Sequence, residues 1–146
     1  MPARIGMRLL KDSGLLEHDL KKKVAVYKIK LEEIIARHHI DIVEMPDYND
    51  YTRFCSSFVP FPELSVSVIV KLNGSMTYFN SEAGKATPGH ILKMEQTILN
   101  QAAAVSAASK YTAVKSTECL AYDKNIEVLY NGIDTDIPIS NVTRDP

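Results

Sequence analysis

The sequence is poor in cysteine, lacks tryptophan, contains no long apolar run and carries almost no net charge. Cys55 and Cys119 are the only cysteines in 146 residues and form no Cys-x-x-Cys pair, so we expect two reduced thiols and no disulfide framework. The net charge of −1 excludes a strongly basic nucleic-acid binder. No apolar run approaches the roughly 18 residues that a membrane-spanning helix requires. We therefore expect neither a nucleic-acid partner nor a membrane span.

Motifs for metal, cofactor and nucleophile sites are also missing. His38 and His39 are adjacent, so on a helix they point to different sides, whereas two histidines that share a metal ion need i, i+4 spacing. The chain contains no P-loop, no G-x-G-x-x-G motif and no G-x-S-x-G motif. We predict no metal ion and no cofactor.

Helix and strand patterns alternate along the chain, and 45% of its residues are hydrophobic, enough for the core of one domain. Helical spacing predicts a helix over 24–39, followed by a β-rich segment over 40–45. The other expected elements are a strand over 66–72, a helix starting at Pro88, a short strand over 102–105, a helix capped by Ser106 that runs to about Cys119, and a strand over 126–130. This order predicts an α/β fold: a three-layer, Rossmann-like parallel sheet with helices on both faces.

We assign residues 24–136 to this domain. Residues 1–23 form an uncertain N-terminal segment, in which Lys21 to Lys23 are a solvated basic run. Residues 137–146 contain two prolines and polar residues, a composition typical of a linker or tail.

Small and polar residues follow every predicted strand, where ligands gather in open parallel sheets. Asp47, Asn73 and Gly74 follow the first two strands, and Ser109 and Asn131 follow the last two. Glycine lets a backbone approach a ligand, and Asp and Asn can hold sugar hydroxyls. The same residue types are ordinary turn formers, so plain turns are the competing interpretation.

Glu95 shares a helix face with apolar residues, because it follows Ile91 by four residues and precedes Ile98 by three. A carboxylate in such a place can be a perturbed functional group. The alternative is structural: Glu95 would lie at the edge of the apolar stripe or cap a neighbouring helix.

Four segments resemble, in order, motifs of family 4 glycosyltransferases of the GT-B fold. Residues 40–48 (IDIVEMPDY) resemble the family's DIIE-x-P-D strand and loop, and residues 70–75 (VKLNGS) resemble its next strand and H-G loop. Glu95 followed by residues 102–113 (AAAVSAASKYTA) resembles the stretch E…AD-x-V-x-x-V-S-x-Y-T-A. Residues 126–134 (IEVLYNGID) resemble I-x-V-I-Y-N-G-I-D, which closes the family's N-terminal domain. The resemblance covers roughly residues 24 to 135.

The resemblance implies a hexosyltransferase-like enzyme of polysaccharide biosynthesis with two Rossmann-like domains that face a cleft. The N-terminal domain mainly receives the acceptor, a glycan or a lipid-linked molecule, and the C-terminal domain mainly binds the nucleotide-sugar donor. No metal held by an Asp-x-Asp motif is implied. The substrate-binding candidates are Asp47, Tyr48, Asn73, Gly74, Ser75, Glu95, Ser106, Ser109 and Asn131. Such an enzyme works in the cytoplasm or at the membrane periphery.

Three departures from the family pattern bear on activity. Residues 1–23 contain no convincing opening strand with its glycine-rich loop, and no donor domain is found in the chain. Asn73 stands where the family often has histidine, and an amide cannot act as a general base. We therefore predict an incomplete, acceptor-side domain that is inactive without a donor-binding domain.

Two other hypotheses stay open. The first is a noncatalytic binding or interaction module that retains the half-fold and pairs with a donor-domain chain or with a second copy, because a missing strand would leave an exposed sheet edge. The second is an unrelated flavodoxin-like or nucleotide-binding domain.

Overall fold

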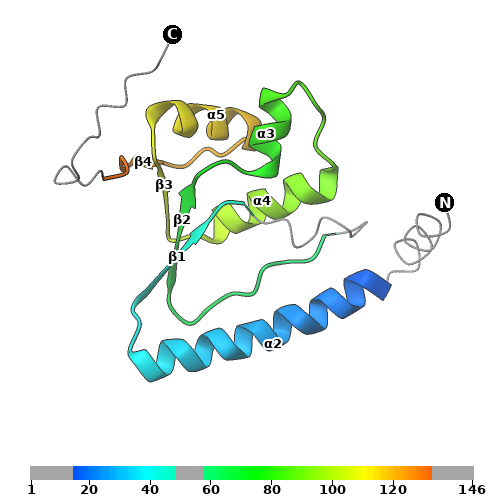
Figure 1. Cartoon of the computed structure of the whole chain (residues 1–146), viewed down its shortest axis with the longest axis vertical. Helices are drawn as coiled ribbons and strands as arrows, with labels where there is room; N and C mark the ends of the chain where they lie inside the picture. Colours follow the sequence, from blue (N-terminus) through cyan, green and yellow to red (C-terminus); the bar gives the residue numbers. More distant parts are fainter. Residues whose placement is uncertain (1–14, 49–57, 133–146) are drawn as a thin grey trace, which may run out of the picture.

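A computed structural model of the chain describes residues 15–48 and 58–132 (Figure 1). Helices and strands follow one another in the order that the sequence predicts, with one additional short helix after the second strand. The elements are α2 (Leu15–His38), β1 (Ile42–Pro46), β2 (Ser67–Leu72), α3 (Met76–Glu82), α4 (Gly89–Gln101), β3 (Ala104–Ala107), α5 (Lys110–Leu120) and β4 (Glu127–Val128).

The four strands form one parallel sheet in the order β1-β2-β3-β4. The register aligns Met45 with Val70, and Val70 with Val105. From β2 onward, each strand pairs with the strand that precedes it in the sequence and lies on the same side of it. Right-handed crossovers then place the connecting helices on one face, and α3, α4 and α5 do contact one another.

The core lies between these helices and the sheet. Val70 and Leu72 of β2 point to the same face because they are two residues apart, and both are completely buried. The helix α4 contributes the i, i+3, i+4 set that its sequence predicts. The buried cluster contains Val70, Leu72, Ile91, Met94, Ile98, Leu99, Val105, Ala107, Leu120 and Tyr122. The predicted α/β fold with a Rossmann-like parallel sheet is confirmed.

Several predicted boundaries are wrong. The strand expected over 102–105 lies at Ala104–Ala107, so Ser106 is part of β3 and does not cap a helix. Ser109 caps α5 instead, and its hydroxyl accepts a hydrogen bond from the Thr112 amide. The last strand is shorter than the predicted 126–130.

Two helices differ more strongly from the sequence-based expectation. The helix expected from residue 24 begins by Leu15, so the basic run at Lys21 to Lys23 lies on its exposed surface. The helix α3 was not predicted at all; only Thr77 within it is buried, so it lacks an apolar stripe.

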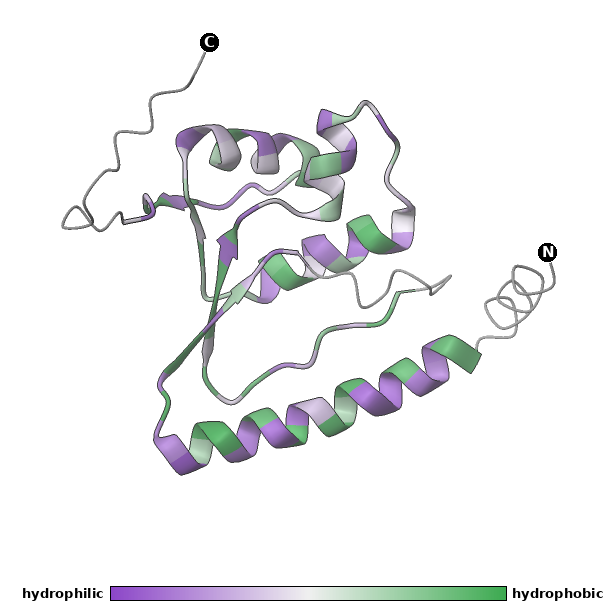
Figure 2. Ribbon diagram, in the orientation of Figure 1, coloured by the Kyte–Doolittle hydropathy of each residue, from purple (hydrophilic) through white to green (hydrophobic). Residues whose placement is uncertain are grey.

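The helix α2 lies apart from the other three helices (Figure 1). Within it, only Glu17 and Ile35 are buried. Hydrophobic and polar residues alternate all along it in Figure 2. Glu32 fastens it to the segment before β2, because its carboxylate accepts hydrogen bonds from the Ser65 amide and hydroxyl. No helix in the described part of the chain is long and apolar enough to cross a membrane.

Candidate functional site

The carboxyl end of β1 is joined to the carboxyl end of β2 by one buried carboxylate. Asp47 directly follows β1 and is 4% exposed. Its Oδ1 accepts a hydrogen bond of 2.8 Å from the Asn73 amide, and both carboxylate oxygens lie within 3.2 Å of the Gly74 amide. Asp47 therefore fixes the start of the loop that follows β2.

A second buried carboxylate fixes the end of the same loop. Glu95 on α4 is 2% exposed and accepts hydrogen bonds from the Met76 amide at 2.8 Å and the Thr77 amide at 3.1 Å. These amides belong to the first turn of α3, where donors lack partners within the helix. The Ser75 hydroxyl accepts from the Tyr78 amide and completes the cap. Glu95 thus caps the neighbouring helix α3, which is one of the two structural roles that the sequence suggests for it.

The loop also requires glycine at its centre. Gly74 has φ +124°, a conformation that residues with a side chain rarely adopt. A Cβ atom there would lie 2.6 Å from Cζ of Phe79. The turn chemistry of this loop and its two carboxylate anchors therefore specify one backbone path.

Both carboxylates lose solvent on folding. Burial raises the pKa of Asp47 and of Glu95, and it outweighs the hydrogen bonds from the loop, which lower both values. Protons are thus held more tightly by these two groups than by exposed carboxylates. Both acids are structural anchors whose oxygens already face backbone donors.

The outer surface of the loop is aromatic and neutral. The Asn73 residue is exposed, as are Tyr48 and Phe79. The rings of Tyr48 and Phe79 meet edge to face with centroids 6.5 Å apart, and Tyr78 packs against Phe79 at 5.4 Å. Sequence reasoning missed the two aromatic residues of α3. Their signal was the capping Ser75, followed three and four residues later by Tyr78 and Phe79.

The remaining candidates lie within or after the strands β3 and β4. Ser109 follows β3 and its hydroxyl is used as a helix cap. Asn131 is exposed beyond β4. Ser106 is buried inside β3 and is not presented at the surface. The structure thus gathers Asp47, Tyr48, Asn73, Gly74, Ser75 and Glu95 around one loop, and places Ser106, Ser109 and Asn131 on the two following strands and their ends.

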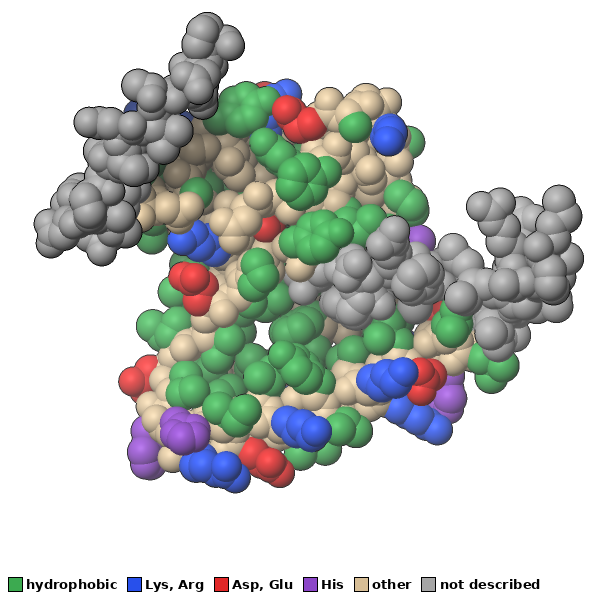
Figure 3. Space-filling model, in the orientation of Figure 1, with side chains coloured by type: hydrophobic (Ala, Val, Ile, Leu, Met, Phe, Trp, Pro, Cys, Tyr) green, Lys and Arg blue, Asp and Glu red, His purple; other side chains and the backbone are tan. Residues whose placement is uncertain are grey.

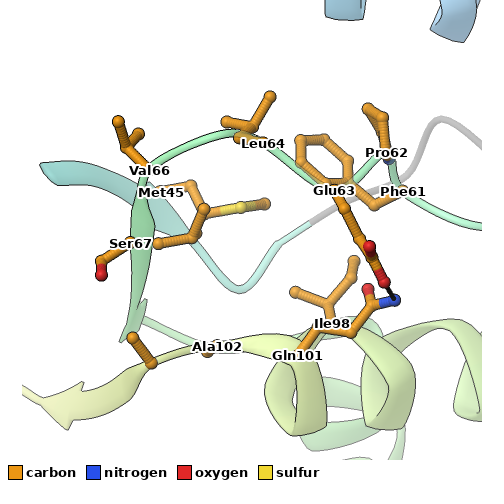
Figure 4. A pocket seen from close by; sticks show the side chains of 12 residues that line it. Met45, Phe61, Pro62, Glu63, Leu64, Val66, Ser67, Ile98, Gln101 and Ala102 are labelled. Carbon is orange, nitrogen blue, oxygen red and sulfur yellow. Dashed lines mark hydrogen bonds between the residues drawn. The ribbon is translucent and has the colours of Figure 1, made fainter. Parts of the chain in front are cut away.

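Two hollows lie elsewhere, beneath the segment 58–66. The smaller has a volume of about 250 Å³ and lies at the amino ends of β2 and β3, where the Gln101 amide donates to the Glu63 carboxylate across its mouth (Figure 4). The larger, about 590 Å³, lies between α2 and β1 and is lined mainly by apolar side chains. Figure 3 shows hydrophobic side chains gathered around this opening. Neither hollow is lined by Asn73 or Tyr48.

The fold and the loop define the class of protein: a parallel α/β domain with its polar surface at the carboxyl edge of the sheet. The family model described as Glycosyltransferase Family 4 matches residues 13–137. The chain therefore belongs to Glycosyltransferase Family 4. Searches of curated proteins and of solved structures found no match to the chain.

Proposed function

We propose that this chain is the acceptor-side domain of a glycosyltransferase that moves a sugar from a nucleotide-sugar donor to a glycan or lipid-linked acceptor. The observation that carries the proposal is the surface formed by Asn73, Tyr48 and Phe79 at the carboxyl edge of the sheet. An amide offers both donors and acceptors to sugar hydroxyls, and exposed aromatic rings pack against the apolar faces of sugar rings.

The electrostatics of the loop favour a neutral, hydroxyl-rich ligand there over a diphosphate. An anion binds to a loop through free backbone amides. Here the amides of Asn73, Gly74, Met76 and Thr77 already donate to Asp47 and Glu95. The diphosphate of a nucleotide sugar would compete with these carboxylates and be repelled by them, so we assign the donor to a different surface.

Transfer then depends on a donor-binding domain. A general base must reach the acceptor hydroxyl with a free oxygen or nitrogen. At this loop the two carboxylates are buried and hydrogen-bonded, and Asn73 cannot accept a proton. The role of the chain is therefore to hold and orient the acceptor hydroxyl, which lowers the entropy cost of the reaction.

A titration of the labelled full chain tests this assignment. Amide spectra are recorded with a panel of oligosaccharides, and separately with UDP and GDP, at up to roughly millimolar ligand. We expect an oligosaccharide to shift the amides of Tyr48, Asn73 and Phe79. Tight UDP or GDP binding at the same amides would contradict the proposal, and so would sugar transfer by the chain alone.

Replacing Asn73 by alanine is expected to weaken acceptor binding about tenfold, because it removes an exposed group with one or two hydrogen bonds to the sugar. The side chain takes part in none of the loop hydrogen bonds, whose donor is the backbone amide. Thermal stability should therefore change little. The matched control is Asn100→Ala, an exposed asparagine near the C-terminal end of α4, which should change neither property. Equal loss of stability and binding on Asn73→Ala would favour a plain turn.

A further inference from the structure

The outer face of α2 carries apolar side chains that nothing in the described part of the chain covers. Val26 is 53% exposed and Ile29 is 60% exposed. The inner face of the same helix is already covered, because Val24 and Leu31 line the larger hollow and Ile35 is buried. On the outer face, Val26 and Ile29 therefore form a small exposed apolar patch, which is a candidate contact surface.

The exposed residues of the outer face are spaced as in a heptad repeat, with two apolar residues at the centre and charged residues on either side. Asp19, Val26 and Glu33 are seven residues apart, and so are Lys22, Ile29 and Ala36, with the two series offset by three. These are the a and d positions of one stripe. All members of this stripe are exposed: Asp19, Lys22, Val26, Ile29, Glu33 and Ala36. We call these six residues the α2 stripe.

The α2 stripe is complementary to itself when a second copy runs antiparallel. In an antiparallel pair, a positions face d positions. A twofold axis between residues 27 and 28 then sets Val26 against Ile29 of the second copy. On either side it sets Lys22 against Glu33 of the second copy, so opposite charges meet. A parallel pair would instead set Lys22 against Lys22 and Glu33 against Glu33.

The position of the axis also gives nearly full overlap. The helix has 24 residues and is about 36 Å long. The axis falls close to its middle, so residues 17–38 of each copy run alongside one another. We propose that α2 is a homodimer interface, in which the stripes of two chains pair antiparallel around Val26 and Ile29. This proposal is independent of the sugar-transfer function.

The flank of the stripe limits the affinity. Lys23 and Lys30 lie on the same side of the seam, and the twofold axis brings Lys23 of one copy beside Lys30 of the other. Asp19 offsets part of this repulsion through its ion pair of 2.7 Å with Lys23. We expect a dimer whose association depends on salt, because these pairs are exposed.

Sedimentation equilibrium of the full chain over a range of concentrations tests the proposal. We expect a monomer–dimer equilibrium. Lys22→Glu and Glu33→Lys should each weaken association about tenfold or more, because two like-charge contacts replace two ion pairs. The double variant should recover the dissociation constant to within about threefold of the wild type. The matched control is Lys21→Glu, which makes the same charge change on exposed surface outside the stripe.

Lys30→Glu provides a test in the opposite direction, since it places a carboxylate beside Lys23 of the second copy. It should tighten the dimer about threefold. Circular dichroism of each variant checks that α2 remains folded. A wild-type chain that is monomeric at every concentration would overturn the proposal and leave the stripe to a different partner. A dimer unchanged by both single reversals would also overturn it.

Discussion

Replacing Glu95 by alanine is expected to lower the free energy of unfolding by about 2–3 kcal/mol. The change removes the acceptor of two charge-assisted hydrogen bonds and leaves the Met76 and Thr77 amides without their partner at the start of α3. Relief of carboxylate burial works in the other direction. The variant also leaves two backbone amides of the seven-residue helix α3 without an acceptor, a cost that does not enter the pKa balance, and we expect this cost to exceed the relief. Urea unfolding followed by circular dichroism measures the difference.

Glu118→Ala is the matched control, because that carboxylate lies on the exposed side of α5 and makes only a long contact of 3.9 Å with Lys115. Its effect should stay within about 0.5 kcal/mol. Comparable losses for the two variants would show that Glu95 does not hold α3.

The difference in unfolding free energy between wild type and Glu95→Ala is expected to depend on pH. Burial raises the folded-state pKa of Glu95 above its ordinary value of 4.5, so the folded chain binds more protons than the unfolded chain between these two values. The stabilising contribution of protonation is complete below pH 4.5 and is lost as pH rises through the raised pKa. Wild type should therefore exceed Glu95→Ala by more at mildly acidic pH than at neutral pH. Urea unfolding at both pH values checks this, and a constant difference would contradict it.

Replacing Asp47 by alanine is expected to cost about 2 kcal/mol of stability and to weaken acceptor binding by more than tenfold. Asp47 holds the Asn73 and Gly74 amides, so its loss frees the part of the loop that presents the Asn73 side chain. The positive φ of Gly74 then loses its external support. Urea unfolding and the oligosaccharide titration measure the two effects on one protein.

Two further variants serve as controls in this test. Asp47→Asn keeps one oxygen acceptor and should recover about half of both losses. Asp41→Ala removes an exposed carboxylate just before β1 and should change neither. Full acceptor affinity in Asp47→Ala would mean that the loop does not carry the acceptor.

The strand β2 and the helix α4 could be predicted because their signals are local. The apolar run of β2 ends at Leu72, and the apolar residues Ile91, Ile98 and Leu99 recur at helical spacing in α4. Each pattern lies within one short segment of the sequence, and these residues are buried as expected. The alanine-rich stretch before Ser106 has no strong preference for strand, because alanine is not a strand-forming residue. The predicted strand therefore begins two residues before the observed one. Pairing with β2 decides that register, and pairing is not visible in the sequence.

The helix α3 escaped prediction for a related reason. Its N-terminus is held by Ser75, which the sequence presents as a turn residue, and by Glu95, which lies 18 residues after Thr77. An even larger separation of 26 residues hid the role of Asp47, whose partners directly follow the next strand. Sequence reasoning found the residues of the loop but could not distinguish ligand contacts from contacts within the chain.

The loop between β2 and α3 is tied to β1 across 26 residues and to α4 across 19. Such a loop cannot open by itself, because each of its anchors belongs to a different element of the core. Its amides should therefore exchange with solvent only when β1, β2 and α4 come apart together, as one cooperative unit. A ligand that arrives at this surface finds the backbone already ordered, so little conformational entropy is lost on binding.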